Sequence, residues 1–143
     1  MTDRYAVIGN PIAHSKSPTI QVAFAASTGQ DMSYERLLAP LDGFRATVER
    51  FAAEGGLGLN VTIPFKLEAF ELATETTQRA RLAGAVNTLK RIDGGWLADN
   101  TDGAGLVRDL MHNHGIVVTG EAVAILGASG SGKSTLLALL AGL

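Results

Sequence analysis

Short apolar runs alternate along the chain with segments whose apolar residues recur at the three- and four-residue spacing of a helix. The run at residues 5–8 stops at Gly9-Asn10-Pro11, which is typical of a strand followed by a turn. The same pattern predicts strands at 32–39, 57–63 and 122–126, a hairpin of 86–92 and 96–98, and helices at 17–29, 41–54, 65–73, 77–82, 102–114 and 133–141.

Strands that alternate with helices favour a mainly parallel sheet with both faces covered. We therefore predict an α/β fold, with a three-layer, mainly parallel domain at residues 1–119 and an additional strand–P-loop–helix unit at 120–143. Only Glu121 and Lys133 are charged after residue 120, and the last helix is apolar all the way round. Such a helix is expected to pack on the preceding domain, to pair with a second copy as a homo-oligomer, or to aggregate.

Composition and charge exclude some classes of function but do not identify one. The 143 residues are 46% hydrophobic and 18% charged, with a formal net charge of −2, which argues against binding nucleic acid by a basic surface. Cysteine is absent, which excludes disulfides and thiolate metal sites, and we predict no metal site. We see no signal peptide and no apolar run long enough for a bilayer, so we expect a soluble cytoplasmic protein that does not enter a membrane.

Two polar clusters lie at predicted junctions between strands and helices. Ser15 and Ser17 lie where a helix begins, and free N–H groups there suit a carboxylate, although Ser17 could merely cap the helix. Asn60 and Thr62 share one face of a strand end, because side chains repeat every two residues. Lys66 follows in the first helical turn, where the helix dipole disfavours its charge. That suits proton transfer, unless it is an ordinary surface lysine.

Two further clusters follow. Asn87 precedes a strand and could bond a ligand hydroxyl, or could be a turn residue. Asp102 lies where a helix begins, so it is either a cap or one half of an acid–base pair with Lys66. Each motif alone is weak evidence for a ligand-binding site, and the appearance of all four in this order is stronger evidence.

The four clusters, at residues 9–18, 60–66, 83–88 and 99–103, resemble in order and spacing the signature blocks of the shikimate dehydrogenase family. The likeness covers residues 1 to about 120, which correspond to the N-terminal substrate domain of that family. Members reduce 3-dehydroshikimate to shikimate with NADPH. The resemblance thus implies an NADP-dependent oxidoreductase of aromatic amino-acid biosynthesis.

The resemblance also implies roles for individual residues. Ser15 and Ser17 would hold the substrate carboxylate, and Lys66 and Asp102 would be the catalytic pair, with Lys66 giving a proton to the carbonyl oxygen. The substrate hydroxyls would be bound by Asn60, Thr62, Asn87 and Asp102. A site built on such hydrogen bonds rejects analogues that lack a hydroxyl.

The resemblance breaks near residue 120. Where the family has a loop resembling Gly-Ala-Gly-Gly-Ala, this chain has Gly-x-x-x-x-Gly-Lys-Ser between a predicted strand and helix, and residues 120–143 resemble an ABC-transporter ATPase. The candidate cofactor-binding residues are Gly127, Ser129, Gly130, Gly132, Lys133, Ser134 and Thr135. In a P-loop, Lys133 would reach ATP phosphates and Ser134 would hold Mg²⁺, whereas in an NADP site Ser129 would crowd the pyrophosphate. The loop could also be a glycine-rich turn that binds nothing.

The rest of either nucleotide domain is not present in the sequence. No Walker B aspartate follows, and the position about 20 residues past the first glycine of a dinucleotide loop is absent. We therefore expect the substrate-binding half of a shikimate dehydrogenase, inactive or very weak alone, as a natural hybrid, an engineered chimera or a truncated chain. The alternatives are a phosphate- or nucleotide-binding P-loop module and an assembly protein that swaps its apolar tail.

Overall fold

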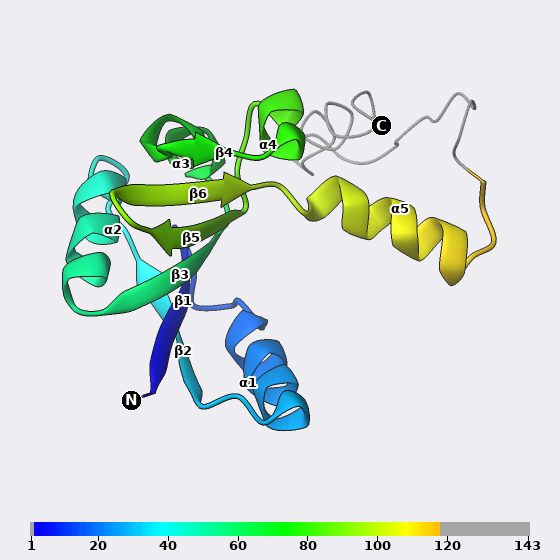
Figure 1. Cartoon of the computed structure of the whole chain (residues 1–143), viewed down its shortest axis with the longest axis horizontal. Helices are drawn as coiled ribbons and strands as arrows, with labels where there is room; N and C mark the ends of the chain where they lie inside the picture. Colours follow the sequence, from blue (N-terminus) through cyan, green and yellow to red (C-terminus); the bar gives the residue numbers. More distant parts are fainter. Residues whose placement is uncertain (1, 118–143) are drawn as a thin grey trace.

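The computed structural model describes residues 2–117 (Figure 1). Within them, strands and helices alternate almost as the sequence pattern predicts. In chain order the elements are β1 (Asp3–Gly9), α1 (Ser17–Thr28), β2 (Met32–Leu38), α2 (Phe44–Ala53), β3 (Gly56–Val61), α3 (Lys66–Leu72), β4 (Glu75–Thr76), α4 (Gln78–Ala83), β5 (Thr88–Ile92), β6 (Gly95–Asp99) and α5 (Asp102–His112). The predicted unit at 120–143 lies outside the described residues.

The strands form one sheet in the order β2-β1-β3-β5-β6-β4. β1 pairs in parallel with β2 and β3, β4 pairs in parallel with β6, and β5 is antiparallel to β3 and β6. The predicted α/β class with a mainly parallel sheet is therefore confirmed. The predicted hairpin is β5–β6, and its turn contains Gly94 at a φ of 82°, which a side chain would disfavour.

One face of the sheet carries the hydrophobic core. Ala6 and Ile8 of β1 share this face, because alternate strand residues point the same way, and they belong to one buried cluster with side chains of α2, α3 and α4. Phe44 of α2 stacks on Phe65, with ring centroids 5.0 Å apart, and both side chains are fully buried. This packing holds the strand ends that carry the polar clusters.

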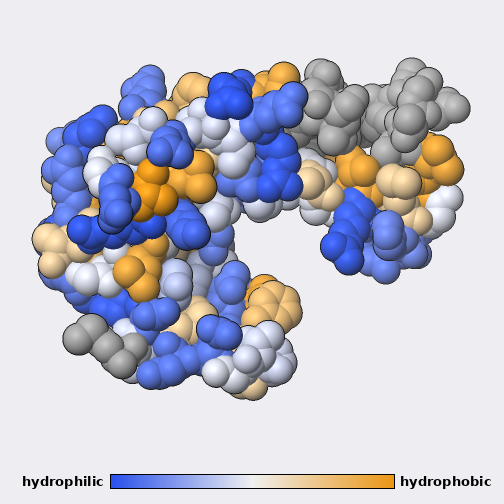
Figure 2. All heavy atoms as spheres, viewed as in Figure 1, coloured by the Kyte–Doolittle hydropathy of each residue, from blue (hydrophilic) through white to orange (hydrophobic). Residues whose placement is uncertain are grey.

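The opposite face is covered less completely. α1 lies on this side against β2 and β1, and a cavity of about 550 Å³ beside it is lined by residues that include Gln21, Tyr5 and Tyr34. Ile20 and Phe24, which the spacing places on one helix face, remain 49% and 59% exposed. Figure 2 shows apolar side chains at the surface over α1 and α5, and a hollow between these two helices.

Element boundaries differ from the prediction in places. The second helix begins at Phe44 rather than at Leu41, because the backbone N–H of Gly43 bonds the carbonyl of Pro40 in a turn. Lys16, and not Ser17, is the N-cap of α1, so the capping interpretation of Ser17 is wrong. The two-residue strand β4 was not predicted. Among residues 2–117, no helix has the length and apolar character that crossing a membrane requires.

Candidate active site

Lys66 and Asp102 meet at the centre of the candidate site. Each is the first residue of its helix, α3 and α5, and each helix follows the end of a strand. Lys66 Nζ lies 2.6 Å from Asp102 Oδ2, and the side chains are 23% and 36% exposed. The carboxylate supplies negative charge that offsets the unfavourable position of the lysine at a helix N-terminus. The pair is thus held together yet open to a ligand.

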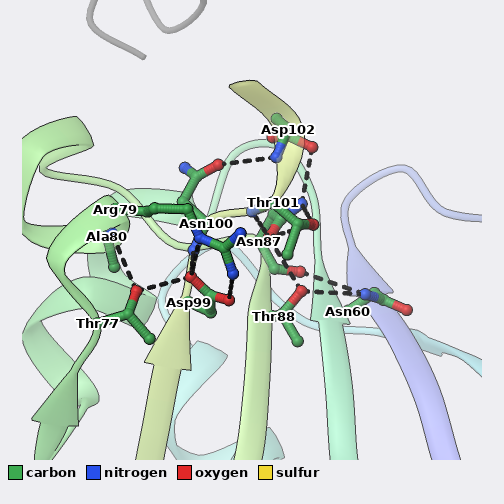
Figure 3. Close-up of polar contacts among 10 residues, drawn as sticks. All are labelled: Asn60, Thr77, Arg79, Ala80, Asn87, Thr88, Asp99, Asn100, Thr101 and Asp102. Carbon is green, nitrogen blue, oxygen red and sulfur yellow. Dashed lines mark hydrogen bonds and ion pairs between the residues drawn. The ribbon is translucent and has the colours of Figure 1, made fainter. Parts of the chain in front are cut away.

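Asp102 is held by two asparagines. Asn87 Nδ2 donates to Asp102 Oδ1 at 2.7 Å, and the Asp102 backbone N–H donates to Asn100 Oδ1 at 3.1 Å. Thr101 is the N-cap of α5 and its side chain makes no capping hydrogen bond, so the capping interpretation of Asp102 is wrong. The carboxylate of Asp102 therefore faces Lys66 and Asn87 rather than its own helix. Figure 3 shows the contact with Asn87.

Asp99 and Asn100 build the turn that carries Asp102. Asn100 is fully buried, and its Nδ2 donates to the carbonyl of Ala85 at 3.0 Å. Asp99 accepts hydrogen bonds from Thr77 Oγ1 at 2.6 Å, from the Asn100 backbone N–H at 2.8 Å and from Arg79 (Figure 3).

Burial raises the pKa of Asp99, but the bonds from Arg79, Thr77 and Asn100 outweigh burial and hold that pKa below its usual range. Sequence reasoning assigned no role to Asp99 or Asn100. Their place between a strand and a helix, beside the candidate Asp102, was the signal that could have marked them as supports.

Asn60 lies at the end of β3, and Thr62 directly follows this strand, which ends at Val61 rather than at the predicted residue 63. Asn60 Nδ2 approaches Thr88 Oγ1 at 3.4 Å and the Asn87 carbonyl at 3.5 Å, so the polar ends of β3 and β5 meet. Thr62 packs against the turn after β1, since a Cβ on Gly9 would come within 2.6 Å of Thr62 Cγ2. Gly9 is therefore required for this close approach.

Ser15 and Ser17 lie in the loop before α1 and at its first residue. Ser15 Oγ is 3.2 Å from Ser17 Oγ and accepts from the Ser17 backbone N–H at 3.3 Å. Arg36 of β2 donates to the Ser15 carbonyl from Nε at 2.9 Å.

The sheet register relates these serines to the rest of the site. Arg36 and Asn60 both pair with Val7 of β1 and therefore lie on one face, two strands or about 10 Å apart. The residues predicted to bind the carboxylate and those predicted to bind hydroxyls are thus associated with the same sheet face.

The candidate cofactor residues, Gly127 to Thr135, lie outside the described residues. Within residues 2–117, no group of three or more His, Asp or Glu side chains is placed to hold a metal ion. The described site therefore consists of hydroxyl, amide, ammonium and carboxylate groups. Such groups can bind a small polar acid and move a proton.

Comparisons with known proteins point to one family. A shikimate dehydrogenase (NADP(+)) of Herminiimonas arsenicoxydans is 62% identical over 140 residues, which are 98% of this chain and 51% of that protein. An Ael1 enzyme from Pseudomonas putida has 48% identity and a TM-score of 0.85, over 99% of this chain and 52% of that one. Shikimate 5-dehydrogenase from Thermus thermophilus, solved with NADP(H) and shikimate, has 33% identity and a TM-score of 0.81, over 96% and 52%.

Two of the comparisons overlap at the C-terminal end. The ABC transporter family model matches residues 112–143, most of which lie outside the described residues. The likeness to the Herminiimonas enzyme, however, runs over 140 of the 143 residues, so it extends past residue 120, where the sequence motifs suggested that it ends.

The chain spans about half the length of the curated relatives it matches. The model of the shikimate dehydrogenase substrate binding domain matches residues 7–89, more than half of the chain, and the chain belongs to this family.

Proposed function

We propose that this chain binds shikimate and 3-dehydroshikimate as the substrate-binding part of an NADP-dependent shikimate dehydrogenase. The observation that carries the proposal is the 2.6 Å contact between Lys66 and Asp102, brought together from two separate strand–helix junctions. The family membership of residues 7–89 and the NADP(+)-dependent relatives support the same reading. A pair of this kind, close together and partly exposed, suits proton transfer to a bound ligand.

The proposed reaction divides between the cofactor and these side chains. NADPH, when bound, supplies the hydride that reduces the carbonyl carbon of 3-dehydroshikimate. The Lys66 ammonium gives a proton to the carbonyl oxygen, which becomes the hydroxyl, and the resulting amine recovers a proton from water. Asp102 holds Lys66 Nζ in place at 2.6 Å and is the acceptor for a substrate hydroxyl.

The carboxylate of the substrate would lie at the loop before α1. Ser15 and Ser17 present two hydroxyls 3.2 Å apart there, and Arg36 places positive charge beside them. The hollow in Figure 2 lies between α1, which begins at Ser17, and α5, which begins at Asp102.

Titration of the 143-residue chain with shikimate, by calorimetry or NMR, tests the proposal. We expect saturable binding, weakened about 10- to 100-fold by Asp102→Ala, because a hydrogen bond to a charged group contributes about 1.5–3 kcal/mol. Lys66→Ala should weaken binding less, by about 3- to 10-fold, since most of its role lies in proton transfer. Arg45→Ala is the control, because Arg45 is an exposed cation on α2, on the other side of the sheet, and is in no ion pair among residues 2–117. Absence of binding at millimolar shikimate by a folded chain contradicts the proposal, and a larger loss for Lys66→Ala than for Asp102→Ala contradicts the assigned roles.

A second candidate function has one observation in its favour. The ABC transporter family model matches residues 112–143, which include the Gly-x-x-x-x-Gly-Lys-Ser motif. A phosphate-binding loop there would bind ATP–Mg²⁺, with Lys133 contacting phosphates. Titration with ATP–Mg²⁺, repeated with Lys133→Ala, decides between the two, and we expect no binding because the shikimate dehydrogenase likeness covers the same residues.

A further inference from the structure

A chain of hydrogen bonds leads from the edge strand β2 to the Lys66–Asp102 pair. The hydroxyl of Tyr34 lies 2.6 Å from Asn60 Oδ1, and Asn60 Nδ2 lies 3.4 Å from Thr88 Oγ1. Thr88 Oγ1 is 2.9 Å from Asn87 Oδ1, and Asn87 Nδ2 is 2.7 Å from Asp102 Oδ1. Figure 3 shows the part of this chain from Asn60 to Asp102. The chain of bonds joins residues of β2 and β3 and the start of β5 to the start of α5.

The direction of every bond follows from the chemistry of the groups. An ionised carboxylate only accepts, so Asn87 turns its NH₂ group toward Asp102. The backbone N–H of Thr101, which only donates, bonds the other end of the same amide, Asn87 Oδ1, at 3.0 Å. The Thr88 hydroxyl therefore donates to that oxygen, and its own oxygen accepts from Asn60.

The last link is at Tyr34. With the Asn60 NH₂ group directed at Thr88, Asn60 Oδ1 faces Tyr34, and the phenol hydroxyl donates to it. Each donor in the chain thus points toward Asp102, an arrangement in which successive bonds polarise one another. Burial raises the pKa of Tyr34 above its usual range, so the phenol keeps the proton that it donates.

We propose that Tyr34 is a positioning residue of the site, which fixes the orientation of the Asn60 amide and, through Thr88, that of the Asn87 amide beside Asp102. Its effect on shikimate affinity rests on the proposed function, whereas its effect on the amides does not. Without the phenol hydroxyl, only the 3.5 Å contact of Asn60 Nδ2 with the Asn87 carbonyl still favours this orientation of the amide. The amide then turns over more readily by rotation about its χ2 angle.

Tyr34→Phe tests the proposal, since it removes one oxygen and keeps the ring. Tyr5→Phe is the matched control, because Tyr5 pairs with Tyr34 in the sheet register and lines the same cavity. Its hydroxyl makes no side-chain hydrogen bond among residues 2–117, so the control removes the same atom outside the network. We expect Tyr34→Phe to weaken shikimate binding about 3- to 10-fold and Tyr5→Phe to change it less than about 2-fold. Equal affinities for the two variants overturn the proposal.

A double-mutant cycle separates positioning from a general loss of stability. Thr88→Val interrupts the same chain without touching a residue that is assigned to the ligand. If Tyr34 acts through Thr88, the variant with both substitutions binds about as well as Thr88→Val alone. Losses that multiply show that Tyr34 acts independently of the chain and overturn the proposal.

The side-chain NH₂ resonances of Asn60 and Asn87 give a measurement without ligand. In the ligand-free chain, both pairs of signals should shift in Tyr34→Phe and stay in place in Tyr5→Phe. If wild-type chain fails to bind shikimate but these signals shift, the proposed function fails and the positioning role stands. If shikimate binds to the wild-type chain and the signals stay in place in Tyr34→Phe, the positioning role fails and the proposed function stands.

Discussion

Asp99 carries a charge that three neighbouring groups stabilise, and Asp99→Asn removes this charge with little change in shape. The carboxylate accepts from Thr77 Oγ1 at 2.6 Å, from the Asn100 backbone N–H at 2.8 Å and from Arg79 Nε at 3.2 Å. All three reach the same oxygen, Oδ1, so an asparagine keeps an acceptor for them but loses the charge and the Arg79 contact at Oδ2. The substitution thus tests how much the ionised form contributes to the turn before Asp102.

The expected loss follows from the strength of these bonds. Hydrogen bonds to a charged group contribute about 1.5–3 kcal/mol and neutral ones about 0.5–1.5 kcal/mol, so the bonds from Thr77 and Asn100 weaken but persist. Arg79 is half exposed, and solvent screening limits its ion pair with Asp99 to about 0–1 kcal/mol. We expect Asp99→Asn to lower the free energy of unfolding by about 1–2 kcal/mol at pH 7.

The loss of unfolding free energy in Asp99→Asn should become smaller as the pH falls. Because the folded chain lowers the pKa of Asp99, the unfolded chain binds the proton more tightly. The stabilisation is therefore fully present above the unfolded pKa, about 4, and is lost as the pH falls through the lower folded pKa. The difference between wild type and Asp99→Asn should stay constant from about pH 7 to 5 and close in stronger acid.

Urea denaturation at several pH values, followed by the fluorescence of the single buried tryptophan, Trp96, measures this difference. Asp93→Asn is the control, because Asp93 lies in the exposed β5–β6 turn and is in no ion pair among residues 2–117. It should change the free energy of unfolding by less than about 0.5 kcal/mol. A wild-type advantage over Asp99→Asn that persists unchanged at pH 2–3, well below about 4, would refute the charge-based explanation.

Two further predictions concern packing and buried polarity. Phe65→Ala should lower the free energy of unfolding by about 3–5 kcal/mol, since Phe65 is fully buried, whereas Leu41→Ala, at a side chain 68% exposed, should cost less than about 0.5 kcal/mol in the same urea assay. Asn100→Ala leaves the Ala85 carbonyl and the Asp102 N–H without their partner, so we expect a loss of about 1–3 kcal/mol together with weaker shikimate binding by calorimetry. An Asn100→Ala chain as stable as wild type would contradict this reading of the turn.

The sequence pattern predicts elements best where periodicity and turn residues agree. The β5–β6 hairpin around Asp93-Gly94-Gly95 and the strand before Gly9 are both found. β4 has only two residues, too few to show a period, and it exists because it pairs with β6 in the folded sheet. Such an element is decided by tertiary contacts.

α1 shows where periodicity misleads. Ile20, Ala23 and Phe24 recur at helical spacing, but Val22 and Ala25 place apolar side chains on other faces, so the spacing does not single out one buried side. Only Ala25 of this helix is buried among the described residues. Spacing alone therefore predicted the helix but not the face that it buries.

For the candidate site, sequence reasoning offered Lys66 and Asp102 as an acid–base pair because each lies at a predicted strand–helix junction, and the two groups are 2.6 Å apart. It could not assign Asn100 or Asp99, whose partners Ala85 and Thr77 lie on other elements. A motif shows which residues lie near a strand–helix junction. It does not show which of them hydrogen-bond to distant segments and so hold the junction in place.

The contribution inferred for Tyr34 extends this argument to the edge of the sheet. Tyr34 and Asn60 are 26 residues apart, on strands separated by β1, and no local pattern links them. The direction of the hydrogen bonds between them is nevertheless determined, because Asp102 at the far end only accepts. A charge at one junction thus dictates the orientation of an amide two strands away, and a phenol on the edge strand completes the chain. If the NH₂ signals of Asn60 do not shift in Tyr34→Phe, the orientation of this amide does not depend on Tyr34, and Asp102 is held by its immediate neighbours alone.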